Sequence, residues 1–307
     1  MPPKPVVVLT AEYPRIARQI LEPHFDVVEH PTEVSRSEED MITILSEADA
    51  AITLLTDPIT RRVLAANPNL RIVANHAVGY NNIDIAAARE LRIIVTNTPG
   101  VLTEATADLT MALMLAVMRR VVEGDREVRG TGRCEWEPMK LHGAALQGRR
   151  LGIIGLGRIG SAVAARARAF GMEVSGVRRG ESSDAILETS DVISIHAPLT
   201  DETRHLINAR TLARMRDGSY LINTARGPIV DEEALCDALD SGHLAGAGLD
   251  VYEHEPVVNP RLLTMNNVVI LPHIGSATAE ARNAMAEIAA TEVLRFLRGQ
   301  PPLHAVT

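Results

Sequence analysis

The sequence predicts an α/β protein with two doubly wound parallel sheets. Its 307 residues suit two domains at roughly 100 to 200 residues each. Short runs of β-branched residues alternate with helical segments in two successive series, and this alternation is typical of parallel β-α units. A glycine-rich turn at 155–160 also follows the first strand of the second series directly.

The first series of elements ends near residue 97. Strands are expected at 6–9, 50–54, 72–74 and 93–95, and helices near 13–21 and 61–66. Asn97, Thr98, Pro99 and Gly100 then interrupt the pattern. Residues 103–120 have the length and composition of one long helix, with acidic residues early and basic residues at its end. We therefore expect a hinge just before residue 103.

The second series begins at Leu151. Strands are expected at 151–154, 173–177, 192–196, 220–223, 246–251 and 268–271, and helices at 158–170, around 208–215 and at 232–241. Residues 130–148, which include the only tryptophan, Trp136, are expected to form a loop. A last helix over about 279–298 is long enough to return to the first domain. The expected domains are therefore 1–98 completed by 284–307, and 99–283.

Composition excludes several classes of partner. The chain has 31 Lys and Arg against 39 Asp and Glu, a formal net charge of −8, which gives no general attraction to nucleic acid or to anionic membranes. Three Phe, one Trp and four Tyr are too few for a base-stacking platform or a membrane belt. The longest apolar stretch, 109–118, has about half the length that a bilayer requires. We expect neither nucleic acid nor a membrane as partner.

Cysteine and histidine usage indicates a reducing compartment and no metal centre. Cys134 and Cys236 are about a hundred residues apart and have no metal-ligand spacing, so we expect free thiols in the cytoplasm. No His, Asp or Glu pair has the spacing of a metal site. The apolar run at 6–9 is too short for a signal peptide and is expected to be a buried strand.

The glycine turn has the G-x-G-x-x-G pattern of a dinucleotide site. Its residues are Gly155, Leu156, Gly157, Arg158, Ile159 and Gly160. An apolar strand precedes the turn and an Ala-rich helix follows it, which is the context that the pattern requires. The first glycine permits the tight turn, the second lets the backbone approach a pyrophosphate, and the third lets helix and strand pack closely. The alternative is a purely structural turn.

The end of the next strand indicates which dinucleotide is bound. An NAD site normally carries an Asp or Glu there, to bind the adenosine ribose hydroxyls. This chain has Arg178 and Arg179 instead, and two guanidinium groups can bind the 2′-phosphate of NADP. We expect NADP. NAD remains possible if the two arginines are only solvated, because Glu181 and Asp184 follow closely.

Three polar residues follow strands of the second series, at the sheet edge where open α/β sheets bind ligands: Arg226, Glu255 and His273. A histidinium can donate a proton to the alkoxide that forms when a hydride reaches a ketone. A neighbouring carboxylate raises the pKa of a histidine, and Glu255 fits that role. Arg226 can bind the carboxylate of a 2-keto acid. Taken singly, these residues could also be a surface ion pair, a solvated loop acid and a capping or core histidine.

The ordered motifs resemble those of D-isomer-specific 2-hydroxyacid dehydrogenases, most closely the glyoxylate/hydroxypyruvate reductase branch. Besides the glycine turn they are VGYNNID at 78–84, NTP at 97–99, HAPLT at 196–200, NTARG at 223–227, GLDVYEHEP at 248–256 and PHIGS at 272–276. The resemblance covers nearly the whole chain. It implies a Rossmann cofactor domain and a flavodoxin-like substrate domain with a cleft between them, and reduction of glyoxylate or hydroxypyruvate to the D-2-hydroxy acid.

The resemblance also assigns site residues. Arg226 would bind substrate, Glu255 rather than Glu253 would be the paired carboxylate, and His273 would be the general acid/base. The substrate site would further include Leu55 and the backbone amides of Val78 and Gly79. Besides the glycine turn and the two arginines, the cofactor would contact Thr106, Ala197, Pro198, Thr224, Ala225, Asp250 and Gly275.

The family also implies a homodimer joined through the cofactor domain, with residues 103–120 and 130–148 in the joining region. This chain departs from the family pattern at Lys140, where the reductase branch often has a second tryptophan, and in residues 180–190, which are shorter than the usual helix-and-strand passage. Other D-2-hydroxyacid dehydrogenases, of the phosphoglycerate or lactate type, are an alternative. So is a dinucleotide-sensing binding module of the corepressor type without turnover.

Overall fold

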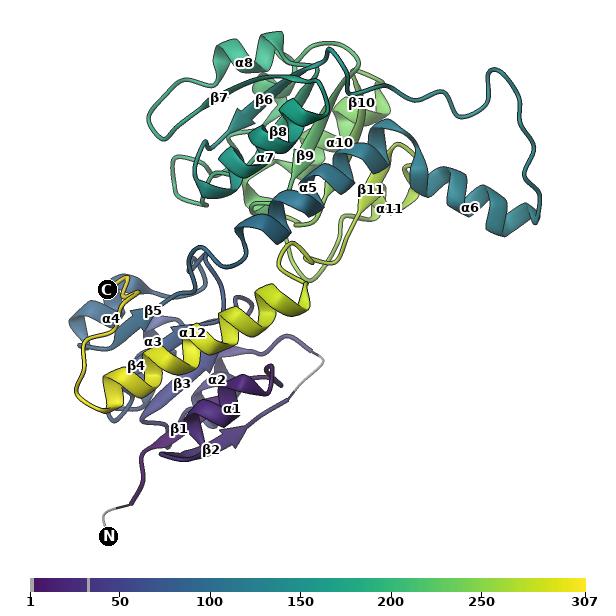
Figure 1. Cartoon of the computed structure of the whole chain (residues 1–307). Helices are drawn as coiled ribbons and strands as arrows, with labels where there is room; N and C mark the ends of the chain where they lie inside the picture. The colour runs from purple at the N-terminus through teal and green to yellow at the C-terminus, as the bar shows by residue number, and fades with distance from the viewer. Residues whose placement is uncertain (1–2, 32–33) are drawn as a thin grey trace. The chain divides into compact units, whose positions relative to one another are not determined.

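The computed structural model describes residues 3–31 and 34–307, and the chain divides into two compact units (Figure 1). The first unit comprises Met1–Leu102 and Ala277–Thr307, and the second comprises Thr103–Ser276. The expected domain boundaries were 98/99 and 283/284, four residues before the first division and seven residues after the second. The first unit is therefore built from both ends of the chain.

The first unit has a five-stranded parallel sheet in the order β2-β1-β3-β4-β5, the flavodoxin-like order. Its strands are β1 (Val6–Leu9), β2 (Asp26–Glu29), β3 (Ala50–Thr53), β4 (Ile72–Asn75) and β5 (Ile94–Thr96). Four of these strands were expected from the sequence. The fifth, β2, was not, because this short edge strand has an acidic residue at each end and no fully buried side chain.

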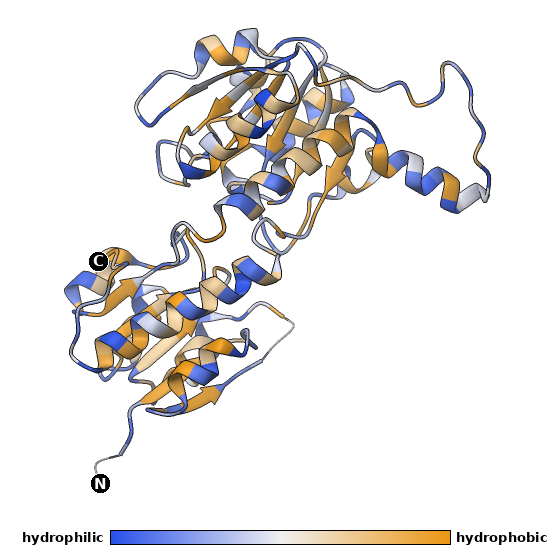
Figure 2. Ribbon diagram, viewed as in Figure 1, coloured by the Kyte–Doolittle hydropathy of each residue, from blue (hydrophilic) through white to orange (hydrophobic). Residues whose placement is uncertain are grey.

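Helices cover both faces of this first sheet. One face packs against α1 (Ile16–Leu21) and α12 (Ala279–Leu297), and the other against α2 (Glu38–Ile44), α3 (Arg61–Ala66) and α4 (Ile85–Glu90). Alternate residues of β1 face opposite sides, since Val7 and Leu9 belong to one apolar cluster and Val8 to the other. Figure 2 shows the resulting apolar strands. The expected helix at 13–21 begins only at Ile16.

The second unit has a six-stranded parallel sheet in the order β11-β10-β9-β8-β6-β7. Its strands are β6 (Arg150–Ile154), β7 (Glu173–Val177), β8 (Val192–Ile195), β9 (Ser219–Asn223), β10 (Leu244–Leu249) and β11 (Val268–Ile270). In a Rossmann sheet of order 3-2-1-4-5-6 a further strand would pair outside β7. Here α8 (Asp184–Thr189) leads directly to β8, so the shortened 180–190 segment leaves β7 at the sheet edge.

Helices also cover both faces of the second sheet. The long α5 (Thr103–Met118) and α7 (Arg158–Ala169) pack on one face. The other face carries α8, α9 (Ala209–Leu212), α10 (Glu232–Asp240) and α11 (Pro260–Thr264). Both apolar clusters contain strand residues that alternate along β6 and β8, as expected for a sheet buried on two sides.

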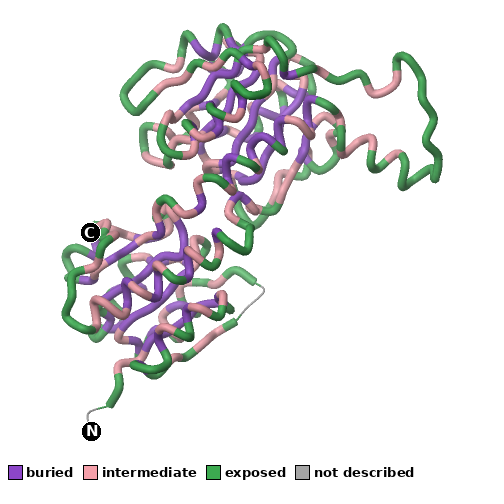
Figure 3. The backbone as a smooth tube through the Cα atoms, in the orientation of Figure 1, coloured by how far each residue is buried: buried purple, intermediate pink, exposed green. Residues whose placement is uncertain are grey.

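An exposed arm, residues 121–145, extends from the second unit. Its helix, α6 (Val121–Thr131), has no buried residue, and most of the loop that follows is exposed (Figure 3). The sequence did not predict α6, because its composition offers no apolar face for a core. The preceding helix was expected to reach Arg120, but it ends at Met118, and Arg120 has a left-handed φ of 54° between the two helices.

No helix within the described ranges is long and apolar enough to cross a bilayer. The same ranges, 3–31 and 34–307, contain no group of three or more His, Cys, Asp or Glu side chains that could hold a metal ion. Of the two cysteines, Cys134 is exposed and Cys236 is buried, and both are free thiols.

Candidate active site

The glycine turn joins β6 to α7, and each of its glycines has a different environment. A Cβ on Gly155, which has a φ of +101°, would lie 2.6 Å from the amide nitrogen of Ala197. A Cβ on Gly160 would lie 2.2 Å from the carbonyl oxygen of Gly155. A Cβ on Gly157 would meet nothing within 4 Å. The first and third glycines are therefore required by packing, whereas the space beside the second is open.

That open space suits a dinucleotide phosphate. Gly157 is the N-cap of α7, a helix of 12 residues, so the first amide groups of the helix and its positive end face this region. Gly157 itself has no side chain that could cap the helix. The backbone on both sides of Gly157 thus fits the pyrophosphate-binding role that the sequence predicts for the turn.

Arg178 and Arg179 lie beside the glycine turn. They follow β7 directly, and the carbonyl oxygen of Val177 accepts hydrogen bonds from the amides of Gly155 (2.9 Å) and Leu156 (3.0 Å). Both arginine residues are exposed. The backbone amide of Arg178 donates to Oε2 of Glu181 at 2.6 Å, so this acid closes the turn. Two solvated cations therefore flank the end of the edge strand.

A second cluster joins residues that the sequence predicted for the nicotinamide side. Asp250 follows β10, and its Oδ1 and Oδ2 accept the amides of Ile274 (2.7 Å) and Gly275 (2.8 Å). The hydroxyl of Thr106 donates to the carbonyl oxygen of Gly275 at 3.1 Å. Burial raises the pKa of Asp250, while the two amides and His273 oppose that shift. This aspartate thus fixes the backbone immediately after His273.

Thr110, on the buried face of α5, also belongs to this cluster, and it was not identified from the sequence. Its hydroxyl lies 2.9 Å from the hydroxyl of Thr224 and donates to the carbonyl oxygen of Thr106 at 2.8 Å. A helical spacing of four residues from Thr106 was the only signal in the sequence that could have identified it. The pair links α5 to the loop after β9.

His273 and Glu255 form a direct pair. Nδ1 of His273 lies 2.9 Å from Oε2 of Glu255, and Oε1 of Glu255 accepts the amide of Tyr252 at 3.0 Å. Burial raises the pKa of Glu255, but the hydrogen bond and charge of His273, the Tyr252 amide and the charge of Arg226 together hold it below its usual value. The carboxylate is therefore ionised at neutral pH and can accept a hydrogen bond from Nδ1 of His273.

The backbone holds His273 in an uncommon conformation. Its φ is 55°, in the left-handed region that residues other than glycine rarely adopt. The Asp250 carboxylate, through the amides of the next two residues, holds the backbone in place at this point. Strained residues that are fixed in this way cluster at functional sites.

Arg226 follows β9 on a loop shaped by Asn223. The side chain of Asn223 accepts the amide of Ala225 at 3.0 Å and donates to the carbonyl oxygen of Arg226 at 3.0 Å. The next residue, Gly227, touches the loop that carries Glu255, because a Cβ there would lie 1.8 Å from the carbonyl carbon of Tyr252. Burial lowers the pKa of Arg226 and the charge of Glu255 raises it. A guanidinium remains protonated under these conditions.

The structure brings Glu255, and not Glu253, to His273. Oε1 of Glu253 lies 2.6 Å from Nε2 of His205, and its Oε2 accepts the amide of Glu232 at 3.1 Å. Glu253 therefore connects its loop to the start of α10. Arg226, Glu255 and His273 lie after β9, β10 and β11, three neighbouring strands of one sheet.

The substrate residues predicted in the first unit also follow adjacent strands. Leu55 lies after β3, and Val78 and Gly79 lie after β4. All three are partly exposed. They occupy the carboxyl edge of the first sheet, where ligands of open α/β sheets bind.

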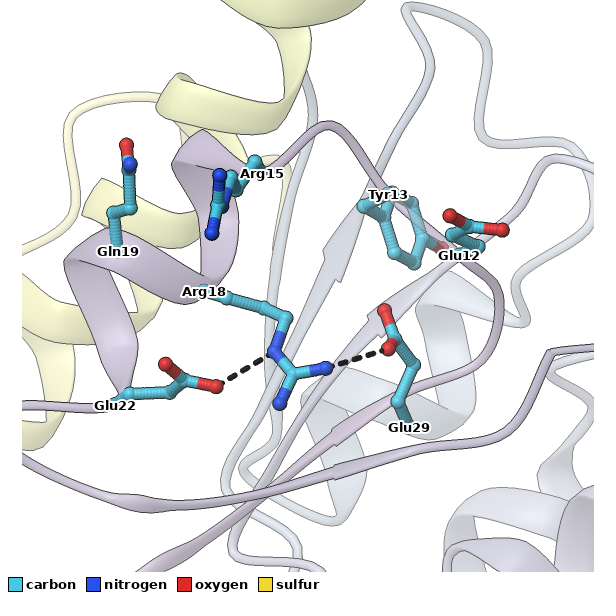
Figure 4. A pocket seen from close by; sticks show the side chains of 7 residues that line it. All are labelled: Glu12, Tyr13, Arg15, Arg18, Gln19, Glu22 and Glu29. Atoms are coloured by element: carbon cyan, nitrogen blue, oxygen red, sulfur yellow. Dashed lines mark hydrogen bonds and ion pairs between the residues drawn. The ribbon is translucent and has the colours of Figure 1, made fainter.

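Two cavities lie away from these residues. One, of about 580 Å³, is in the first unit beside α1, and Figure 4 shows its mixed charges, with Arg18 bound to Glu22 (2.6 Å) and Glu29 (3.0 Å). The other, of about 400 Å³, lies between α5, α6 and the start of β11. Neither cavity is lined by a residue that the sequence predicts for the active site. The candidate active site is therefore defined by its side-chain contacts and not by a cavity.

Comparison with known proteins identifies close relatives along the whole chain. The family model for "D-isomer specific 2-hydroxyacid dehydrogenase, NAD binding domain" matches residues 111–275. A glyoxylate reductase from Korarchaeum cryptofilum is 46% identical over 318 residues, which cover 99% of this chain and 96% of the relative.

Solved structures agree with this comparison. The TT0316 protein from Thermus thermophilus has a TM-score of 0.93 at 43% identity, covering 98% of this chain and 100% of that one. The NADPH-dependent glyoxylate/hydroxypyruvate reductase from Sinorhizobium meliloti, solved with NADP and malonate, has a TM-score of 0.83 at 31% identity and covers 99% and 97%.

Proposed function

The chain belongs to the D-isomer-specific 2-hydroxyacid dehydrogenase family, and from that premise we propose that it reduces glyoxylate or hydroxypyruvate to the D-2-hydroxy acid with NADPH. It is an oxidoreductase with an NAD-binding domain. The observation that carries the proposal is the pairing of His273 with Glu255 at 2.9 Å, with Arg226 following β9, the strand next to the one that precedes Glu255. The names of the similar reductases support the choice of substrates.

In the proposed reaction His273 is the general acid. Its Nδ1 faces Glu255, which leaves Nε2 to donate a proton to the carbonyl oxygen of the keto acid. Glu255 is ionised and orients the imidazole through Nδ1, so that Nε2 of the ring is directed to the substrate. Arg226 binds the substrate and stabilises the negative charge that develops on the oxygen. The nicotinamide cofactor, when bound, supplies the hydride that completes the reduction.

The substrate carboxylate is assigned to the first unit. We propose that the amides of Val78 and Gly79 bind it and that Leu55 forms an apolar wall beside it. On this assignment the first unit is the substrate-binding domain and the second is the cofactor domain.

The cofactor is proposed to bind along the carboxyl edge of the second sheet. The turn from Gly155 to Gly160 would hold the pyrophosphate, Arg178 and Arg179 the 2′-phosphate of NADP, and Ala197 and Pro198 the adenosine half. The nicotinamide would lie near Thr106, Thr224, Ala225, Asp250 and Gly275. β7 is the edge strand of the described sheet, and the exposed Arg178 and Arg179 at its end are the groups proposed to discriminate NADP from NAD.

The arm is proposed to join two copies of this chain into a dimer. It exposes Trp136 (84%) and Met139 (78%), side chains that a stable monomer would rarely leave in water together. Lys140 pairs with Glu127 of α6 and ties the loop back to its helix. We further propose that the enzyme works in the reducing cytoplasm, where Cys134 stays a thiol.

A kinetic screen tests the proposed activity. NADPH and NADH are each combined with glyoxylate, hydroxypyruvate, pyruvate and a bulky 2-keto acid, and cofactor oxidation is followed. We expect the fastest turnover with NADPH and one of the first two acids. Turnover only with a bulky acid would indicate another dehydrogenase of the family. Cofactor binding with no turnover on any acid would indicate a sensing module instead.

A further inference from the structure

Three successive carbonyl groups of the loop after β4 accept hydrogen bonds from donors outside that stretch. The carbonyl oxygen of Ala77 accepts the amide of Thr98 at 2.9 Å. That of Val78 accepts Nδ2 of Asn97 at 2.8 Å, and that of Gly79 accepts Nδ2 of Asn75 at 2.8 Å. Three successive peptide groups are therefore oriented by three different donors.

This arrangement also fixes the amide groups. In a trans peptide the N–H points opposite to the C=O of the same unit. The amides of Val78 and Gly79 thus point away from Thr98 and Asn97. Neither amide donates a hydrogen bond to another group within the described residues. Successive backbone N–H groups directed in this way form an anion-binding concavity.

Asn82 connects this loop to the one that carries Leu55. Its Nδ2 donates to the carbonyl oxygens of Leu54 (3.0 Å) and Asp57 (3.0 Å). Its Oδ1 lies 3.4 Å from Nδ2 of Asn75, the same group that holds Gly79. Asn75 is fully buried at the end of β4. Its neighbour Asn82 holds the loop that follows β3, the strand beside β4.

We propose that Asn75, Asn82 and Asn97 form a clamp that sets the affinity for the 2-keto acid. The clamp orients the Val78 and Gly79 amides before the carboxylate binds. It also fixes the loop that carries Leu55 relative to these amides. These asparagines are positioning residues and touch no reacting atom. The inference rests on the proposed function, since it takes the Val78 and Gly79 amides as the carboxylate site. Pre-ordered donors lower the entropic cost of binding an anion.

An asparagine elsewhere in the first unit provides a matched control. Nδ2 of Asn67 also donates to two backbone carbonyl oxygens, those of Leu45 (2.8 Å) and Ala48 (2.8 Å). Asn67 is buried and follows α3, before the start of β4, so it lies away from the carboxyl edge of the sheet. Asn67→Ala and Asn82→Ala each remove two Nδ2 bonds to carbonyl oxygens. Asn67→Ala also removes the bond from the Asn69 amide, and Asn82→Ala the contact with Asn75, but only Asn82 belongs to the clamp.

The test compares steady-state kinetics and thermal unfolding of the full chain. We expect Asn82→Ala to raise the KM for glyoxylate about tenfold, with kcat within about threefold and NADPH affinity unchanged. Asn67→Ala should lower the unfolding temperature without changing KM. An unchanged KM in Asn82→Ala, or an equal rise in Asn67→Ala, would overturn the clamp.

A second variant keeps the test decisive if Asn82→Ala does not fold. Asn97 is only partly buried, and Asn97→Ala removes one bond, to Val78, so a several-fold rise in KM is expected. The two proposals fail differently. If the wild-type protein reduces no keto acid, the proposed function is wrong. If the wild type is active and both variants keep its KM, only the clamp is wrong.

Discussion

Oε2 of Glu255 lies 2.9 Å from Nδ1 of His273, and the other oxygen of this carboxylate accepts the amide of Tyr252. The carboxylate therefore orients the imidazole and is itself oriented by the backbone. Only Nε2 of the ring is left to act on a substrate. This pair gives the first prediction.

Glu255→Gln keeps the shape of the side chain and removes the negative charge beside Nδ1 of His273. We expect kcat for keto acid reduction to fall about 10²-fold, and His273→Ala to lower it by about 10² to 10⁴. NADPH affinity, measured by fluorescence titration, should change little in both variants. The matched control is Glu253→Gln, which alters an acid bound to His205. A loss of kcat in that variant as large as in Glu255→Gln would contradict the assigned roles.

Gly157→Ala tests the glycine turn without disturbing the fold. A methyl group here meets no protein atom within 4 Å, so the unfolding temperature should stay that of the wild type. The same methyl group would occupy the space proposed for the pyrophosphate, and NADPH affinity should fall at least about tenfold. Gly130→Ala, on the exposed helix α6 and also with nothing within 4 Å, is the control. Unchanged NADPH binding by Gly157→Ala would place the cofactor elsewhere.

Arg178→Ala combined with Arg179→Ala tests cofactor choice. If these guanidinium groups bind the 2′-phosphate, the KM for NADPH should rise about tenfold or more, while the KM for NADH changes little. Arg210→Ala, at another exposed arginine of the second unit, controls for the general loss of positive charge. Equal effects of the double variant on the KM for both cofactors would show that these arginines do not bind the 2′-phosphate.

The buried His76 predicts a loss of stability in mild acid. Burial and the charge of Arg282 lower its pKa from 6.5 to about 4. Between these values the unfolded chain binds a proton that the folded protein does not, so the free energy of unfolding falls as the pH drops from 6.5 to 4. The full difference between the two values corresponds to roughly 3 kcal/mol.

His76→Phe keeps a ring beside Tyr13, whose ring centroid is 5.0 Å from that of His76. The variant should lose less stability than the wild type between pH 7 and pH 5, as measured by urea unfolding. Some loss remains, because burial also lowers the pKa of His196 to about 4. His142→Phe, at an exposed site, should behave as the wild type. An identical pH dependence in His76→Phe would show that His76 does not contribute.

Trp136→Ser combined with Met139→Ser tests the proposed dimer. Both side chains are largely exposed on the arm, so the monomer should remain folded and bind NADPH. Sedimentation should show a dimer for the wild type and a larger monomer fraction for the variant, because association would lose two apolar anchors. Leu303→Ser, at a position 66% exposed in the first unit, is the control. A monomeric wild type would rule out the dimer.

The sequence by itself determined the elements whose patterns are local. Alternating β-branched runs identified the strands at 6–9 and 151–154, and the glycine spacing located the turn at 155–160, because side-chain periodicity and backbone sterics act over a few residues. It also placed Arg226, Glu255 and His273 at strand ends. It missed β2 and α6, whose short length or solvent exposure leaves no apolar pattern. It also missed the short helices α2, α4, α8 and α11, each of five to seven residues.

The tertiary structure decided which groups meet. Spacing could not show that Glu255, and not Glu253, lies beside His273, since the choice depends on how the loops after β10 and β11 pack. It could not show that Asn75 and Asn97, 22 positions apart by their numbers, bind neighbouring carbonyl groups of one loop. Such contacts join residues that are far apart in the chain. They form because the carboxyl ends of parallel strands lie at the same edge of the sheet.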